Sequence, residues 1–177
     1  MEAEGGSREK SADELHATGL RTILTSLLSY DAATHDYLSN AKGSFHRVVH
    51  GINIARATGL RISVNMVVMK PNLLHIRRTG ELVHELGAFG FSATRVLPPR
   101  STDYQLPLGF LLTADEVRIV VEQLLSLRES GLQLDSLIPY PTCFFDDEES
   151  WLLLSGRTCS AGKTSIAVAS DGSVRAC

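Results

Sequence analysis

Short runs of apolar residues in the middle of the chain predict three buried strands. They span residues 21–28, 61–69 and 91–97. The first is bounded by polar residues, the second is rich in β-branched side chains, and the third ends at Pro98-Pro99. Because the runs are nearly continuous rather than alternating, they are typical of a parallel sheet that is covered on both faces.

Between and after these strands, apolar residues recur at the spacing of one helix face. Ser44 is placed to cap one helix, Leu73 begins a second, and Thr113 begins a third. The third is the clearest, because Thr113 and Glu116 form a capping box. Residues 30–43 are predicted to be a polar loop. The strand–helix alternation implies parallel strands joined by crossover helices, and therefore an α/β fold.

The two ends of the chain have a different character. Residues 1–11 are small, polar and glycine-rich, as in a disordered leader, and residues 12–19 predict a short helix. Beyond Gly131 the chain is predicted to hold a proline-marked linker followed by short strands and turns. Asp171-Gly172 between two short strand-like runs is a strong hairpin signal.

Composition narrows the function classes. The 177 residues are 44% hydrophobic and 21% charged, with a formal net charge of -3. That balance gives no electrostatic footprint for nucleic acid, and no segment is apolar and long enough to span a membrane. We therefore expect neither nucleic-acid nor membrane partners. The start of the sequence has no secretory pattern, so a cytoplasmic location is expected.

Two of the three cysteines bracket the predicted hairpin. Twelve residues separate Cys159 from Gly172, and four separate Gly172 from Cys177. A hairpin brings its two ends together, so both sulfurs could reach one iron site, because thiolates are the usual ligands of iron–sulfur clusters. The alternative is that the two cysteines are unrelated and buried. The odd number of cysteines argues against a disulfide framework.

The segment from Cys159 to Cys177 resembles the start of the SPASM domain of radical S-adenosylmethionine (AdoMet) peptide maturases. Its opening reads C-x-A-G and its end D-G-x-V-x-x-C, and the spacing fits that family's first signature. Upstream, residues 25–29, 59–68 and 90–98 are similar to the fourth, fifth and sixth strands of such enzymes.

The resemblance implies a fold class and a domain organisation. Residues 12–135 would form the C-terminal half of a radical SAM partial (β/α)6 TIM-like barrel, and residues 136–177 the linker and the start of a SPASM auxiliary-cluster domain. It further implies an enzyme that binds AdoMet and modifies a ribosomally made peptide or protein through a 5′-deoxyadenosyl radical.

The same resemblance assigns cofactor roles to individual residues. Cys159 and Cys177 would ligate an auxiliary [4Fe-4S] cluster, while Ser26 and Asn65 would face AdoMet. Alternatively, Ser26 and Asn65 satisfy neighbouring backbone groups. Cys143 is either a further cluster ligand or a packing residue between aromatic neighbours. No catalytic residue is assigned.

The sequence departs from the family in the motifs it lacks, which include the further SPASM cysteines expected after Cys177. It lacks the Cys-x-x-x-Cys-x-x-Cys loop that holds the catalytic cluster, and the first three barrel strands are expected to lie outside it. We therefore expect a fragment that cannot cleave AdoMet by itself and that aggregates or stays partly molten when expressed alone. A second hypothesis is a non-catalytic, cluster-binding partner module that completes its barrel with another chain. A third is a structural α/β domain.

Other polar and aromatic residues have simpler interpretations. His46 and His50 are four residues apart, but without a third ligand they are expected on a helix surface. His35 and Asp36 could form a polar pair at the barrel mouth, although a capping role is expected for Asp36. Trp151 is expected to anchor the C-terminal segment against the barrel.

Overall fold

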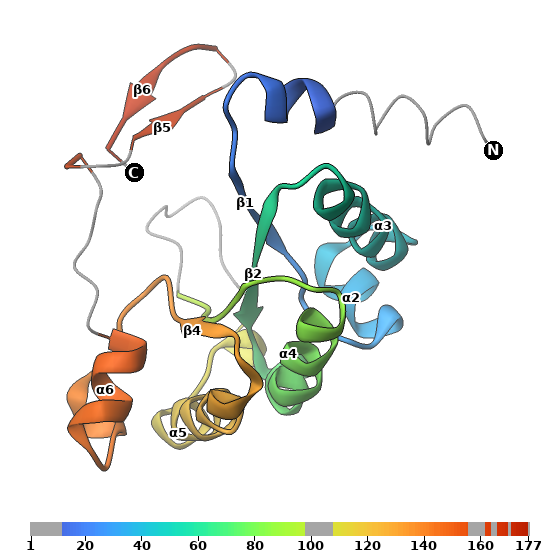
Figure 1. Cartoon of the computed structure of the whole chain (residues 1–177). Coiled ribbons are helices and arrows are strands. Elements are labelled where there is room, and N and C mark those ends of the chain that lie inside the picture. The colour runs from blue at the N-terminus through green and yellow to red at the C-terminus, as the bar shows by residue number, and fades with distance from the viewer. Residues whose placement is uncertain (1–11, 98–107, 156–161, 164–165, 170, 177) are drawn as a thin grey trace.

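The computed structural model describes residues 12–97, 108–155, 162–163, 166–169 and 171–176 (Figure 1). These residues form a parallel sheet of four strands in the order β1-β2-β3-β4. The strands are β1 (Thr22–Ser26), β2 (Arg61–Val68), β3 (Gly90–Arg95) and β4 (Gln133–Asp135). The predicted parallel α/β arrangement is therefore present, with one strand more than the sequence suggested.

Helices connect the strands and lie along one side of the sheet (Figure 1). Two helices join β1 to β2, one helix and a 3-10 segment join β2 to β3, and one helix flanked by 3-10 segments joins β3 to β4. Their bounds are α2 (Ala32–Ser39), α3 (Ser44–Ala57), η1 (Lys70–His75), α4 (Ile76–Glu85), η2 (Leu108–Phe110), α5 (Ala114–Leu125) and η3 (Arg128–Ser130).

The two faces of the sheet differ in chemistry. Alternate residues of β2 and β3 point toward α3, α4 and α5 and form the core, with Val64, Met66 and Phe91 fully buried. The residues between them on β2 and β3 point to the opposite side of the sheet and are mostly polar. We call that side the polar face. The prediction of strands covered on both faces fits β3, whose first five residues are buried, but it is wrong for β1, which alternates in exposure and leaves Leu24 54% exposed.

Three further elements differ from the sequence prediction. The expected loop at residues 30–43 contains helix α2, whose N-cap is Asp31. Strand β4 was not foreseen. The C-terminal part holds a helix, α6 (Glu148–Ser155), after the 3-10 segment η4 (Thr142–Phe144).

The start of α3 is built differently from the prediction. Its N-cap is Gly43, in a left-handed conformation at φ 75°, and not Ser44. The capping oxygens come instead from Asp36 of α2, which accepts hydrogen bonds from the Gly43 and Phe45 backbone N–H groups and the Ser44 hydroxyl. The expected capping role of Asp36 is confirmed, and it joins two consecutive helices.

Several local predictions are confirmed. Residues 12–17 are helical, and the Thr113–Glu116 capping box begins α5. Strands β5 (Ala167–Val168) and β6 (Val174–Arg175) pair antiparallel around the predicted turn.

Helix α6 contacts β4, the last strand of the sheet. Leu154 is fully buried and belongs to the core, as does Tyr140, whereas Trp151 is only half-buried. The anchoring role expected for Trp151 stays a prediction. The boundary at residue 135 stays a prediction, although residues on both sides of it share one core.

Candidate functional site

A row of polar side chains crosses the sheet on its polar face. The strand register aligns Ser26 with Asn65, Asn65 with Ser92, and Ser92 with Asp135. Aligned residues of neighbouring parallel strands project from the same face, so the four side chains form one line. Ser26 and Asp135 are the last residues of β1 and β4, whereas Asn65 and Ser92 lie in the middle of β2 and β3.

Asn65 is the best-defined member of this row. Its Oδ1 accepts a 2.8 Å hydrogen bond from the Thr94 hydroxyl on β3, which fixes the amide. Only 6% of Asn65 is exposed, yet its Nδ2 has no hydrogen-bond partner among the described residues. Every fully buried side-chain nitrogen or oxygen of the described residues has a hydrogen-bond partner. Because the Asn65 Nδ2 has none, it must be partly accessible to solvent. The amide can therefore donate to a bound molecule.

The structure brings the two predicted cofactor-facing residues together. Ser26 is exposed at the end of β1, beside Asn65 in the register. The alternative, that both residues only satisfy nearby backbone groups, does not describe Asn65, whose side-chain oxygen bonds a hydroxyl. Their role toward AdoMet stays a prediction.

A cavity of about 380 Å³ lies beside the row, toward the amino ends of the strands. Its polar residues are Ser63, Ser92, Gln133 and Asp135, and Gly90 lies among them. Apolar residues complete the lining: Leu24, Phe89, Leu134, Leu137 and Leu153. The volume is within the range of small-molecule sites, and the mixture of apolar walls with a few polar groups is typical of them.

Buried hydrogen bonds fix the segments that follow β1 and β2. Asn72, fully buried, donates from Nδ2 to the carbonyl oxygens of Leu28 (2.7 Å) and Val67 (3.0 Å). Its Oδ1 accepts from the Met69 N–H at 2.7 Å. One side chain therefore joins the ends of both strands, which holds the row at a fixed spacing.

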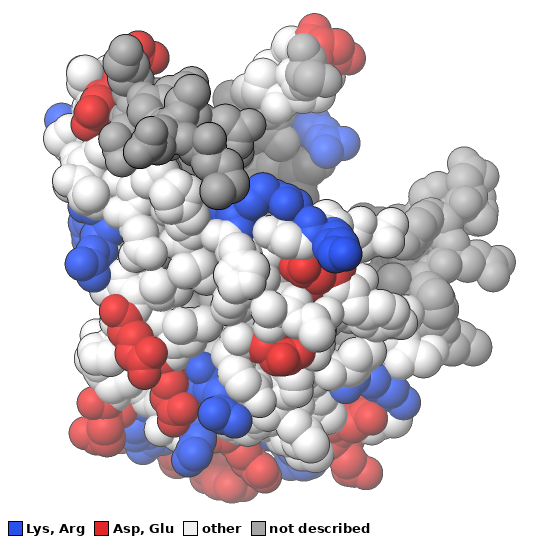
Figure 2. Space-filling model, turned by 90° about the vertical axis from the view of Figure 1, so that its right-hand side faces the viewer, with Lys and Arg blue, Asp and Glu red and all other residues white. Residues whose placement is uncertain are grey.

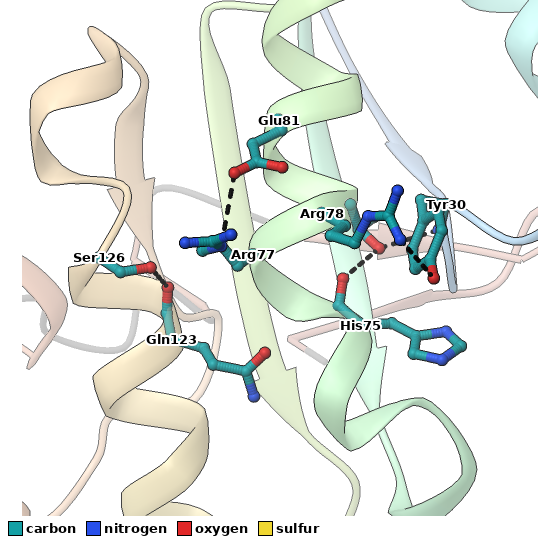
Figure 3. Close-up of polar contacts among 8 residues, drawn as sticks. Tyr30, His75, Arg77, Arg78, Glu81, Gln123 and Ser126 are labelled. Carbon is teal, nitrogen blue, oxygen red and sulfur yellow. Dashed lines mark hydrogen bonds and ion pairs between the residues drawn. The ribbon is translucent and has the colours of Figure 1, made fainter.

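A second set of contacts continues this network away from the sheet. The Ser29 hydroxyl lies 2.8 Å from His75 Nδ1, and the Thr79 hydroxyl accepts from the Tyr30 N–H. Figure 3 shows Arg78 beside Tyr30, with its guanidinium 4.5 Å from the ring centroid and bonded to the phenol oxygen. These contacts join the segment after β1 to the end of η1 and the start of α4.

His35 fixes the same segment after β1. It is buried, and its Nδ1 accepts a 3.1 Å hydrogen bond from the Leu28 N–H. Burial lowers the pKa of His35, with Asp36 opposing the effect. The Asp36 pKa is also lowered, chiefly by the hydrogen bond from the Phe45 N–H. His35 and Asp36 therefore hold the backbone and do not form a polar pair at the mouth.

The structure describes Cys143, one of the three cysteines predicted as metal ligands. Cys143 is a free, exposed thiol, so the packing role is wrong. Cys159 and Cys177 lie outside the described residues. Within those residues no three His, Cys, Asp or Glu side chains gather as metal ligands. His46 and His50 are exposed on α3, as predicted.

Charged side chains of both signs lie on the surface (Figure 2). Figure 2 shows acidic and basic side chains interspersed over one face, without a continuous basic area. Among the described residues, no helix combines the length and apolar character needed to cross a bilayer.

Several site residues were missed in the sequence. Ser63 on β2 lies two residues before the predicted Asn65, and Ser92 on β3 lies two residues before Thr94, which is the spacing of one strand face. That alternation could have revealed the polar face within runs that otherwise look continuously apolar. Gln133 and Asp135 could not have been found, because a strand of three residues carries too little pattern.

Comparison with known proteins gives partial likenesses. No family model matches the sequence. A protein of Methanosarcina barkeri (strain Fusaro / DSM 804) named AdoMet-dependent heme synthase is 33% identical over 86 residues, covering 49% of this chain and 25% of that protein. A protein of the same name from Nitratidesulfovibrio vulgaris is 26% identical over 87 residues, covering 49% and 24%. The chain thus matches about a quarter of the length of these relatives.

One solved structure shares the fold. The crystal structure of Streptococcus suis SuiB superposes with a TM-score of 0.58 at 18% identity, over 88% of this chain and 37% of that chain. The two curated names state dependence on AdoMet, which is the cofactor that the resemblance implies. Together these likenesses support the resemblance to radical SAM enzymes, while none of the names mentions a peptide substrate or an auxiliary cluster.

Proposed function

We propose that this chain forms part of the AdoMet-binding barrel of a radical SAM enzyme, with the polar row facing the cofactor. The observation that carries the proposal is the Asn65 amide, which is held by Thr94 and still has a donor group on the polar face. The likeness to two proteins named as AdoMet-dependent supports it independently.

The residues present fit AdoMet chemically. The cofactor carries ribose hydroxyls and a carboxylate, which are acceptors for the Asn65 Nδ2 and partners for the Ser26 hydroxyl. When bound beside a reduced cluster, AdoMet supplies a carbon-centred radical that abstracts hydrogen from substrate. The contribution of this chain is to orient the cofactor through Asn65 and Ser26, on strands that Asn72 holds together.

The cluster ligands form a separate part of the proposal. Cys159 and Cys177, with Cys143 as a further ligand, would hold an auxiliary [4Fe-4S] cluster beyond the barrel. The exposed position of Cys143 leaves its thiol available. The catalytic cluster would need the Cys-x-x-x-Cys-x-x-Cys motif, which these 177 residues do not contain, so we expect them not to cleave AdoMet unaided.

Two substrate classes are supported by different observations. Similarity to SPASM enzymes in residues 159–177 favours a ribosomally made peptide or protein. The names of the two curated relatives favour a heme-related substrate. Adding each class to the assembled, cluster-loaded enzyme and following AdoMet consumption would separate them, because only the true substrate couples cleavage to its own modification.

AdoMet binding by the full chain tests the proposal. We expect calorimetric titration to show binding that Ser26→Ala weakens severalfold and Asn65→Ala weakens at least tenfold. Thr25→Ala is the matched control, since Thr25 neighbours Ser26 on β1 but projects from the opposite face. Equal affinities for the Ser26 and Thr25 variants and the unchanged chain would overturn the proposed orientation of the site.

A second candidate function is a non-catalytic partner module. It is favoured by β1, which pairs with β2 on one side and with no other described strand on its second side. A parallel strand from another chain could add there. If the full chain binds iron and a partner protein but no AdoMet, this candidate replaces the first.

A further inference from the structure

A chain of hydrogen bonds reaches Asn65 from the segment that follows β4. The Leu137 N–H donates to the Thr94 hydroxyl at 3.1 Å, and that hydroxyl donates to Asn65 Oδ1 at 2.8 Å. Leu137 comes two residues after the end of β4, on the way to α6. The side chain proposed to meet AdoMet is therefore connected to a segment outside the strands of the sheet.

The strand register explains why Thr94 can reach Asn65. Asn65 is aligned with Ser92, and Thr94 lies two residues further along β3. Side chains two residues apart on a strand project from the same face, so Thr94 and Asn65 both lie on the polar face. Each of the two is only 6% exposed. Their hydrogen bond is therefore largely shielded from water, where an unpaired amide oxygen would be costly.

The bonding capacity of the Thr94 hydroxyl sets the orientation of the Asn65 amide. A hydroxyl has one proton and two lone pairs. The Leu137 N–H can only donate, so it occupies one lone pair and leaves the proton for Asn65. If the amide were turned over, its NH2 group would face Thr94, and the Thr94 hydroxyl has no other hydrogen-bond partner among the described residues to take its proton. Pairing every group therefore requires Oδ1 toward Thr94 and Nδ2 away from it.

Further contacts hold the segment after β4 against β3. The Tyr140 hydroxyl donates to the Ala93 carbonyl oxygen at 2.7 Å, and the Arg95 guanidinium donates to the Pro139 carbonyl oxygen at 2.9 Å. Tyr140 is 2% exposed and belongs to the core. Because Ala93 and Arg95 flank Thr94, the segment meets three consecutive residues of β3. The segment is therefore held in a defined position relative to the Thr94 hydroxyl.

We infer that Thr94 is a positioning residue for cofactor binding, and that it links residues 136–140 to the orientation of the Asn65 amide. The inference rests on the proposed AdoMet site, because it assigns how Asn65 comes to present its donor. The Thr94 hydroxyl acts through Asn65, since both of its hydrogen bonds are to protein groups. Residues 136–140 lead to the C-terminal part of the chain, so a displacement there would reach the cofactor site through Thr94.

Threonine variants test the positioning role. Thr94→Val keeps the shape of the side chain but removes the hydroxyl, whereas Thr94→Ser keeps the hydroxyl. In calorimetric titration of the full chain with AdoMet, we expect Thr94→Val to weaken binding about fivefold or more, the effect of losing one hydrogen bond, and Thr94→Ser to stay within about twofold.

Thr25→Val is the matched control. Thr25 projects from the face of β1 opposite to Ser26 and forms no side-chain hydrogen bond among the described residues. We expect its affinity for AdoMet to equal that of the unchanged chain. Equal affinities for the Thr94→Val and Thr25→Val variants would overturn the inference.

The Asn65→Ala background separates positioning from a general structural effect. If Thr94 acts through the Asn65 amide, Thr94→Val should cause no further loss of AdoMet affinity in the Asn65→Ala variant. The same loss in both backgrounds would show that Thr94 acts independently of Asn65, and would overturn the inference.

The backbone amide of Leu137 tests the link to residues 136–140. In the unchanged 15N-labelled chain, we expect its nuclear magnetic resonance signal to shift and saturate on addition of AdoMet, together with the Asn65 side-chain signals. An unmoved Leu137 signal would overturn the link even if a variant failed to fold. Failure of AdoMet to bind the unchanged chain would overturn the proposed function as well, whereas binding that does not depend on the Thr94 hydroxyl would overturn the present inference alone.

Discussion

At the scale of single residues, Asp36 shows how one carboxylate organises two helices. It lies in α2 but accepts three hydrogen bonds from the first residues of α3. We expect Asp36→Ala to lower the melting temperature by about 2–4 °C, the effect of losing a typical helix cap in a chain of this size. Glu81→Ala, which removes only an exposed ion pair with Arg77, should change it by less.

The same carboxylate gives an acid-side pH dependence. The pKa of Asp36 is lowered in the folded chain, so its stabilising effect is present above the ordinary aspartate pKa of 3.8 and is lost as pH falls through the pKa of the folded chain. Melting curves between pH 5 and pH 3 should therefore converge for the Asp36→Ala variant and the unchanged chain. A constant difference down to about pH 2 would contradict the assignment.

His35 gives a second pH dependence, in a different range. Its pKa is lowered below 6.5 by burial, and its Nδ1 must stay unprotonated to accept from the Leu28 N–H. At a pH between the pKa of His35 in the folded chain and its pKa of 6.5 in the unfolded chain, His35 binds a proton only in the unfolded chain. The free energy of unfolding should therefore fall as pH drops below 6.5. Above 6.5 this group contributes no slope.

Urea unfolding at pH 7.5 and pH 5.5 tests this effect. We expect His35→Gln to reduce the loss of stability between the two pH values. His50→Gln, on the exposed surface of α3, should leave the loss unchanged. If both variants show the same pH dependence, the buried His35 is not its source.

At the scale of elements, Gly80 shows a glycine kept for packing. It lies within α4, where a Cβ would approach Leu127 Cδ1 to 2.2 Å and Phe91 Cδ1 to 3.2 Å. Although alanine is a better helix former, we expect Gly80→Ala to destabilise by about 1–3 kcal/mol through overpacking.

A double-mutant cycle measures that contact. Leu127→Ala alone should cost about 2–5 kcal/mol, because it empties a core position. In that background Gly80→Ala should become neutral or stabilising. Additive effects in urea unfolding would show that the two positions do not share space.

The elements that the sequence predicted correctly are those with strong local signals. The capping box of α5 and the Asp171-Gly172 turn each depend on a few adjacent residues. Helix α2 was missed because His35 is its one buried residue, so it has almost no apolar stripe. Strand β4 owes its position to pairing with β3, which no local pattern encodes.

The candidate site was only half predictable for a related reason. Ser26 and Asn65 were identified as polar residues within apolar strands, and the register places them side by side. Ser92 and Asp135 join them because of strand order and register, which are tertiary properties. The cysteines could not be assigned a geometry, since Cys159 and Cys177 lie outside the described residues.

At the scale of the whole molecule, the sheet separates an apolar side from a polar one. The helices cover the apolar side of the sheet, so less apolar surface is exposed than the sequence prediction of aggregation assumed. Leu24 remains exposed on β1, whose outer edge pairs with no other described strand. Such an edge can pair with another chain. Aggregation of the isolated chain stays a prediction.

Substitution at that edge tests it. We expect Leu24→Lys to reduce concentration-dependent association in sedimentation experiments, because a charge on an edge strand opposes pairing. Leu74→Lys is the control, since Leu74 is also exposed but lies in η1, away from the edge. Equal association of both variants would place the contact elsewhere.

The side-chain amide signals of Asn65 and Asn72 test the central claim most directly. Asn72 is an internal control, because its amide nitrogen already donates to two buried carbonyl groups. On addition of AdoMet to the 15N-labelled chain, we predict that the Asn65 side-chain signals shift and saturate while those of Asn72 do not move. Unchanged Asn65 signals at saturating AdoMet would contradict the account.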